Sequence, residues 1–112
     1  TVEQAVVREV QEEAGVTTSV QGVLGLRNRY DEDNGNSLYI VMLLSPVSGE
    51  PQPDNHEVDQ AAYFTLGEIR AIEQISPINV EVAARALSDD KRLHCPQVVT
   101  QTGRAPYTLF LG

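Results

Sequence analysis

The first fourteen residues show helical spacing of apolar positions between polar ones. Thr1 and Gln4 have the spacing of a capping box. In this motif the side chain of each residue accepts a hydrogen bond from the backbone N–H of the other at the start of a helix. Gly15 directly follows Ala14 and is typical of the residue that ends a helix. The pattern therefore predicts a helix that starts at Thr1 and runs to Ala14.

Two strand patterns follow this helix. Residues 16–30, VTTSVQGVLGLRNRY, are rich in residues that favour strands, with Gly22 and Gly25 as expected bends or bulges. The polar stretch Asp31–Ser37 predicts a loop by its composition. Residues 38–47, LYIVMLLSPV, form a nearly continuous apolar run, which is typical of a central strand covered on both faces.

The second half of the chain alternates loops, helices and strands. Two prolines in residues 48–57 exclude regular structure, and residues 58–66, VDQAAYFTL, predict a further short strand. Residues 66–74 predict a short helix, and Ser76 and Pro77 open another helix through about Leu87. Residues 97–112 are ambiguous, with YTLFLG as a candidate edge strand. This order predicts one α/β or α+β domain over residues 1–112.

Charge and composition limit the classes of partner. The 112 residues carry a formal net charge of −8, which argues against a nucleic-acid backbone or an anionic membrane. No apolar run is long enough to span a bilayer. The single cysteine, Cys95, cannot form an internal disulfide and suits a reducing compartment, so we expect a cytoplasmic protein.

Three glutamates crowd one region of the first predicted helix. Glu9, Glu12 and Glu13 fall within an arc of about 100° on its surface, beside the apolar face of Val6 and Val10. Like charges at this spacing repel one another. Two interpretations remain open at this point: a solvated acidic face, or a cluster of hard oxygen ligands for Mg²⁺ or Mn²⁺.

The full string from Arg8 to Val16, REVQEEAGV, adds a specific pattern. It resembles the second half of the Nudix box, Arg-Glu-hydrophobic-x-Glu-Glu-x-Gly-hydrophobic, and matches every specified position without gaps. The first half of the box would precede Thr1. The chain thus resembles a Nudix hydrolase that starts inside its signature, as a fragment, as part of a longer chain, or as a domain that a partner completes.

The resemblance implies a reaction and a role for each matched residue. Nudix enzymes use a divalent metal, here Mg²⁺ or Mn²⁺, to hydrolyse a nucleoside diphosphate linked to another group. Glu9, Glu12 and Glu13 align with the metal-binding carboxylates, and Glu12 and Glu13 are both candidates for the general base. Arg8 matches the arginine that orients these carboxylates by ion pairing.

A further carboxylate is expected from a loop, as in many relatives. The segment DNHEVDQAAYF resembles that loop, and Glu57 is our choice for a fourth metal ligand or the catalytic base. Asp54 and Asp59 lie nearby, and a merely solvated loop acid is an equal alternative. His56 is a candidate for contact with phosphate, although a lone loop histidine is more often simply exposed.

Candidate substrate contacts follow the first predicted strand. Arg27 and Arg29 are two residues apart, so their side chains project to the same face of a strand. They are candidates for binding phosphate or base, and the alternative is neutralisation of the acidic residues just after them. Tyr39 and Tyr30 are candidates for stacking on a nucleobase, although buried strand tyrosines are commoner.

The implied fold is a Nudix-like α/β/α sandwich with a mixed sheet, in which the Nudix-box helix and the Ser76–Leu87 helix cover opposite sides. With the early strands preceding Thr1, sheet edges and apolar surface are expected to be open, which predicts pairing with another chain such as a second copy. The implied function is hydrolysis of a small nucleoside diphosphate derivative. The alternative is a Nudix-fold nucleotide-binding or interaction module that lacks catalysis because its metal site is incomplete.

Overall fold

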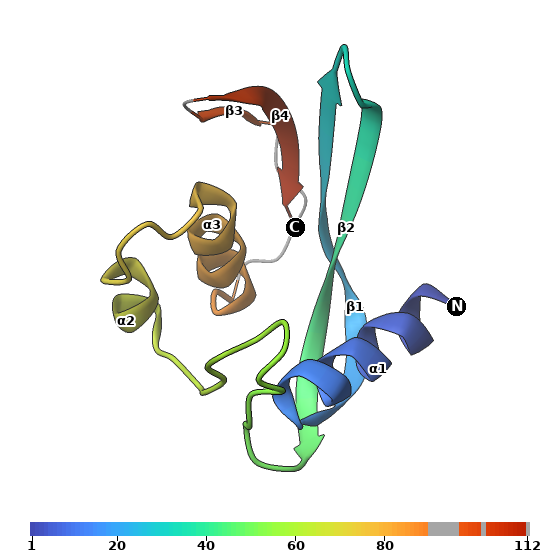
Figure 1. Cartoon of the computed structure of the whole chain (residues 1–112), viewed down its shortest axis with the longest axis vertical. Helices are drawn as coiled ribbons and strands as arrows, with labels where there is room; N and C mark the ends of the chain where they lie inside the picture. Colours follow the sequence, from blue (N-terminus) through green and yellow to red (C-terminus); the bar gives the residue numbers. More distant parts are fainter. Residues whose placement is uncertain (90–96, 102, 112) are drawn as a thin grey trace.

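A long antiparallel hairpin organises the molecule, with a helix across one end and a second hairpin beside the other (Figure 1). The computed structural model describes the backbone of residues 1–89, 97–101 and 103–111, and side chains up to residue 89 and at residues 103, 104 and 106. The elements in chain order are α1 (Val2–Ala14), β1 (Thr17–Asp31), β2 (Gly35–Ser48), α2 (Leu66–Arg70), α3 (Pro77–Ala86), β3 (Gln97–Gln101) and β4 (Arg104–Leu111).

Helix α1 has the two ends that its sequence predicts. The Gln4 amide donates to Thr1 Oγ1 at 3.1 Å, and the Thr1 amino group donates to Gln4 Oε1 at 3.0 Å, which completes the capping box. At the other end Gly15 has a φ of 72° and its amide bonds the Gln11 carbonyl. A left-handed residue at this position favours glycine, because other residues strain there.

Strands β1 and β2 pair along almost their whole length. The register of the pair shifts between Val20 and Gly22 and again between Val23 and Gly25, so the predicted irregularities at both glycines are confirmed. The turn is tighter than the predicted loop, because β2 begins at Gly35. Asp31 Oδ1 closes the turn by accepting the Asn34 amide at 2.6 Å.

The strand order and the pairing directions correct three predictions. The sheet order is β2-β1-β4-β3, so β2 lies at an edge of the described sheet and is not a central strand. Leu38 and Tyr39 of β2 are 62% and 54% exposed, which shows that apolar composition alone did not identify a strand covered on both faces. Strand β4 forms as predicted, but it lies between β1 and β3, and the pairs between described strands are antiparallel instead of mixed.

The strand predicted at residues 58–66 does not form. Residues 58–65 lie outside any helix or strand, and Tyr63 and Phe64 are 64% and 45% exposed. The prediction was wrong because a strand needs a neighbour for its backbone groups, and this segment pairs with none of the described strands, although β2 is an edge strand. The segment therefore runs as an unpaired connection from the hairpin to α2.

Short helices α2 and α3 begin where they are predicted, but α2 ends at Arg70, before the predicted end at residue 74. A second capping box opens α2, with the Glu68 amide donating to Thr65 Oγ1 at 3.2 Å. Ser76 and Pro77 begin α3 as expected, although the Ser76 side chain makes no capping bond. Among the residues whose burial the structure gives, the buried apolar core is Val16, Leu24 and Val41. No described helix has the length and apolarity needed to cross a membrane.

Candidate functional site

Two carboxyl groups from distant parts of the sequence meet beside the C-terminal half of α1. The half-buried Glu13 of α1 and the exposed Glu57 of the loop after β2 lie within interaction range of each other. Hydrogen bonding with the Glu57 carboxyl raises the pKa of Glu13 above its ordinary value, with smaller contributions from burial and from the negative charges of Glu57, Glu9 and Asp54. Four acidic side chains thus influence one another at this end of the hairpin.

The loop that carries Glu57 is attached to the end of α1. The Gln52 amide donates to the Ala14 carbonyl at 2.8 Å, so the loop supplies a partner to a helix C-terminus. Further along, Asp54 Oδ1 accepts the backbone amides of His56 at 3.0 Å and Val58 at 2.8 Å. These amides hold the pKa of Asp54 below its ordinary value. The amide of His56 therefore helps the loop to fold, and its side chain is on the exposed surface.

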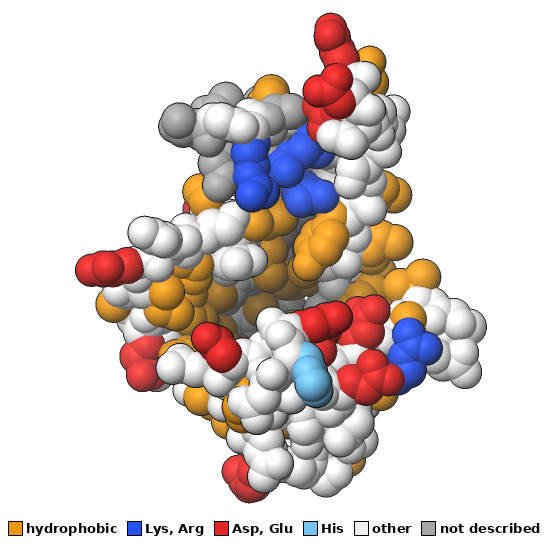
Figure 2. Space-filling view, viewed as in Figure 1, with side chains coloured by type: hydrophobic (Ala, Val, Ile, Leu, Met, Phe, Trp, Pro, Cys, Tyr) orange, Lys and Arg blue, Asp and Glu red, His pale blue; other side chains and the backbone are white. Residues whose placement is uncertain are grey.

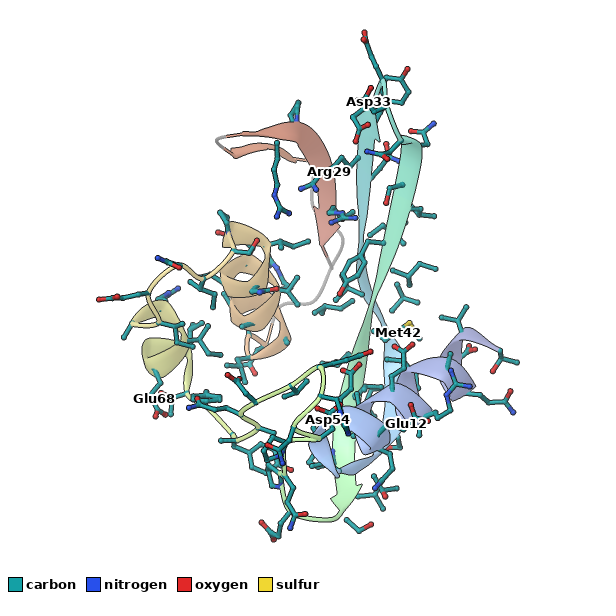
Figure 3. The ribbon with its side chains drawn as sticks, in the orientation of Figure 1. Glu12, Arg29, Asp33, Met42, Asp54 and Glu68 are labelled. Carbon is teal, nitrogen blue, oxygen red and sulfur yellow. The ribbon has the colours of Figure 1, made fainter. Side chains whose placement is uncertain are left out.

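Glu12 has a different partner from Glu13. Its Oε1 lies 3.7 Å from Arg8 Nε, and both side chains are about two-thirds exposed, at 64% and 66%. An exposed pair of this kind contributes little to stability. It nevertheless places the predicted orienting arginine against one of the predicted ligands, Glu12, which is labelled on α1 in Figure 3.

The donors fit a hard divalent cation by type. Carboxylate oxygens are the ligands that Mg²⁺ and Mn²⁺ prefer, and the Glu13–Glu57 contact brings two of them together. Within the part of the chain that the structure describes, no three Asp, Glu, His or Cys side chains are grouped closely enough to hold a metal ion. Binding would therefore require Glu9 or Glu12 to approach that pair, and the metal site stays a prediction.

Three arginines, Arg27, Arg29 and Arg104, lie toward the turn end of the hairpin and are called the arginine strip below. The Arg27 guanidinium lies 4.9 Å from the centre of the Tyr39 ring, its register partner, and Nη2 donates to Ser37 Oγ at 3.4 Å. Arg29 and Arg104 line a hollow of about 380 Å³, shared with the turn residues Asp31, Asp33 and Asn34 and with Gly103. In Figure 2 blue side chains gather above a hollowed centre and red ones below it.

The structure tests the alternatives left open for the two tyrosines and the two arginines of this hairpin. Tyr39 is 54% exposed and Tyr30 59%, which excludes the buried alternative for both tyrosines. Arg29 also lowers the pKa of Asp31, although two hydrogen bonds from Asn34 contribute more. Arg29 thus partly neutralises the acidic turn, whereas Arg27 is oriented by its contacts with Tyr39 and Ser37.

Two residues at these sites were not selected from the sequence. Arg104 begins β4, a segment whose pattern is ambiguous, and only the pairing of β4 with β1 brings it near Arg29. The sequence marks Asp54 only as one of the acids near Glu57. The available signal was its place before Asn55-His56, since aspartate often bonds backbone amides two residues on.

A second, larger hollow of about 430 Å³ lies between α1, the adjoining ends of β1 and β2, and residues 58–64. Its lining is mainly apolar and includes Val10, Val58 and Phe64, with Glu13 among the lining residues. The half-buried position of Glu13 follows from this apolar neighbourhood, which contributes to its raised pKa.

Comparison with known protein families identifies the family of the chain. The family model described as NUDIX domain matches residues 1–86. The chain belongs to the NUDIX domain family. The family resemblance of the sequence is thereby confirmed, and the helices and sheet agree with a Nudix-like α/β fold in which no described strand precedes α1.

A curated Nudix-type relative is the ADP-ribose pyrophosphatase of Methanocaldococcus jannaschii. The two chains are 36% identical over 70 residues, which is 62% of this chain and 41% of the relative. The chain thus spans about two fifths of the length of that relative.

The Nudix match covers the two regions unequally. Residues 1–86 include α1, the loop with Glu57, and both Arg27 and Arg29. Strands β3 and β4 lie beyond the matched range, and Arg104 lies beyond it with them. The acidic residues therefore lie within the range that the family model matches, whereas Arg104 lies outside it.

Proposed function

We propose that this protein is a metal-dependent Nudix hydrolase that cleaves the pyrophosphate bond of a nucleoside diphosphate linked to another group. The observation that carries this proposal is the meeting of Glu13, from the Nudix-box helix, with Glu57, from a loop more than forty residues later. The name of the relative, ADP-ribose pyrophosphatase, makes ADP-ribose the first substrate to test.

Glu9, Glu12, Glu13 and Glu57 are the residues that would hold Mg²⁺ or Mn²⁺. When bound, the cation would supply positive charge against the pyrophosphate and make a water molecule more acidic. Glu57 is exposed and carried by a loop, so it can reach a water at the substrate and accept its proton. Glu13 directs the Glu57 side chain through their hydrogen bond, and Arg8 directs Glu12.

Substrate recognition is assigned to the arginine strip. Arg27 and Arg29, on one face of β1, bind phosphate oxygens, for which the planar guanidinium provides paired donors. The exposed Tyr39 ring, already in contact with the Arg27 guanidinium, offers an aromatic surface for a nucleobase. Arg104 adds a third positive charge beside Arg29.

The direct test is hydrolysis of ADP-ribose with Mg²⁺, with Mn²⁺ and with a chelator, followed by nucleotide sugars, dinucleotides and nucleoside triphosphates. Glu12→Gln should reduce the metal-dependent rate by orders of magnitude, because it removes a ligand or base from the transition state. Glu3→Gln, on the same helix but outside the motif, is the matched control. Nucleotide binding without hydrolysis by the unmodified protein would instead favour a non-catalytic binding module.

A further inference from the structure

We propose that Asp54 is a positioning residue for the reaction, which sets the place of Glu57 by folding the loop around it. Asp54 accepts the backbone amides of His56 and Val58, the residues on either side of Glu57. The proposal rests on the function proposed above, because it assigns Glu57 a part in that reaction.

The loop has little other structure to hold Glu57. Residues 49–65 form no helix or strand, so no ladder of backbone hydrogen bonds fixes them. Asn55 adopts a left-handed φ of 61°, and its amide donates to the Val58 carbonyl at 2.9 Å. A non-glycine residue in this conformation is uncommon and persists where surrounding bonds stabilise it. The Asp54 carboxylate supplies two of those bonds.

The turn is fixed at one end to the helix that carries the other acidic residues. The Gln52 amide bonds the Ala14 carbonyl two residues before Asp54. On the far side Val58 is half-buried and lines the hollow that Glu13 and Val10 also line. Glu57 is therefore held between an anchored turn and an apolar contact, which leaves its carboxyl beside Glu13.

Two substitutions separate the hydrogen-bonding role from the charge of Asp54. Asp54→Asn retains an oxygen that can accept both amides, while Asp54→Ala removes the acceptor. We expect Asp54→Ala to lower kcat about 10- to 100-fold, as is usual when a partner that orients a metal-site residue is lost, with KM changed less than about threefold. Asp54→Asn should retain most of the activity, and Asp59→Ala, a neighbouring loop acid, serves as the control.

Amide hydrogen exchange supplies a readout that does not depend on turnover. In Asp54→Ala the amides of His56 and Val58 should exchange faster, while the Gln52 amide and the amides of α1 keep their protection. Equal loss of kcat in the Asn and Ala variants would overturn the proposal, because it would show that the charge acts directly. Unchanged kcat in Asp54→Ala would overturn it too.

The same measurements distinguish this proposal from the function on which it rests. If the unmodified protein hydrolyses no nucleoside diphosphate derivative with Mg²⁺ or Mn²⁺, the proposed reaction fails, and with it the role of Asp54 in catalysis. If the unmodified protein is active and Asp54→Ala is folded, by an unchanged circular dichroism spectrum, the Ala and Asn rates decide the role of Asp54 alone.

Discussion

The two ends of the β1–β2 hairpin position charged side chains in different ways. At the α1 end, the acidic residues come from a helix and a loop that are joined by the hydrogen bond from the Gln52 amide to the Ala14 carbonyl and by the interaction between the Glu13 and Glu57 carboxyls. At the turn end, the arginines sit on paired strands, where the register of the sheet fixes their spacing. Figure 3 shows both ends, with Asp54 and Glu12 at α1, and Arg29 and Asp33 toward the turn.

The difference also appears in the direction of the pKa shifts. Glu13 has a raised pKa because a second carboxyl is its hydrogen-bonding neighbour, whereas Asp31 has a lowered pKa because Asn34 donates to it. Asp54, at the same end as Glu13, also has a lowered pKa because it accepts two backbone amides, so the unfavourable interaction is concentrated on Glu13. The Asp31 carboxylate at the turn end is satisfied by its own donors. Our proposal places the chemistry at the first end and the recognition at the second.

The largest effect is expected from Glu57→Gln. This substitution keeps the size of the side chain but removes a basic carboxylate, and loss of a general base costs about 10²–10⁴-fold in rate. Measured kcat for ADP-ribose with Mg²⁺ should fall by at least about a hundredfold. Glu50→Gln, in the same loop, should leave kcat unchanged. A normal rate in Glu57→Gln would contradict the proposal that catalysis takes place at this end of the hairpin.

A smaller effect is expected at the turn end from Arg29→Ala. Loss of one substrate contact that is equal in the ground and transition states raises KM by about tenfold, or ~1.4 kcal/mol, with little change in kcat. Arg104→Ala should act in the same direction. Arg70→Ala, in the last turn of α2, provides a surface-arginine control. A fall in kcat without a change in KM would contradict the division of roles between the two ends.

A substitution outside both ends of the hairpin provides a reference for the effect of lost stability on the kinetics. Thr65→Ala removes the oxygen that accepts the Glu68 amide in the α2 capping box. A lost cap costs about 1 kcal/mol, which corresponds to a fall in Tm of about 4 °C for a domain of this size. Thermal melting should show this fall, while kcat and KM stay constant. Altered kinetics here would mean that general destabilisation also explains effects at the two ends.

The smallest effect is expected from acidification of the turn. The folded pKa of Asp31 lies below its ordinary value of 3.8, so its contribution to stability is present above pH 3.8 and is lost as pH falls through the folded pKa. A pH titration followed by NMR should show the Asp31 carboxyl titrating below 3.8, together with a fall in the protection factor of the Asn34 amide, which is its exchange relative to the intrinsic rate at the same pH. Asp31→Asn, which stays uncharged, should remove the pH dependence of that protection factor.

Local features of the fold could be predicted from the sequence, and pairings could not. The α1 caps, the bulges at Gly22 and Gly25 and the start of α3 depend on neighbouring residues, which are visible in the sequence. The edge position of β2 depends on which strands it meets, and its apolar run gives no information on that point.

The candidate site divides in the same way. The helix pattern groups the glutamates of α1, and the family resemblance directs attention to Glu57. The place of Asp54 before Asn55-His56 is a local signal for the bonds that fold the loop. No local rule reveals that β4 brings Arg104 beside Arg29, because that approach depends on the pairing of strands far apart in the sequence.

The close approach of Gly49 to Gly15 limits how related chains can vary in length. A side chain at Gly49 would place its Cβ 2.5 Å from the Gly15 carbonyl oxygen, and Gly49 has a φ of 91°. The backbone at Gly49 therefore packs directly against the C-terminal end of α1, with no room for a side chain. The hydrogen bonds of Gln52 and Asp54 follow within a few residues. Insertions or deletions between residues 49 and 57 would displace Glu57 directly. Length differences should instead accumulate in residues 59–64 and at the β1–β2 turn.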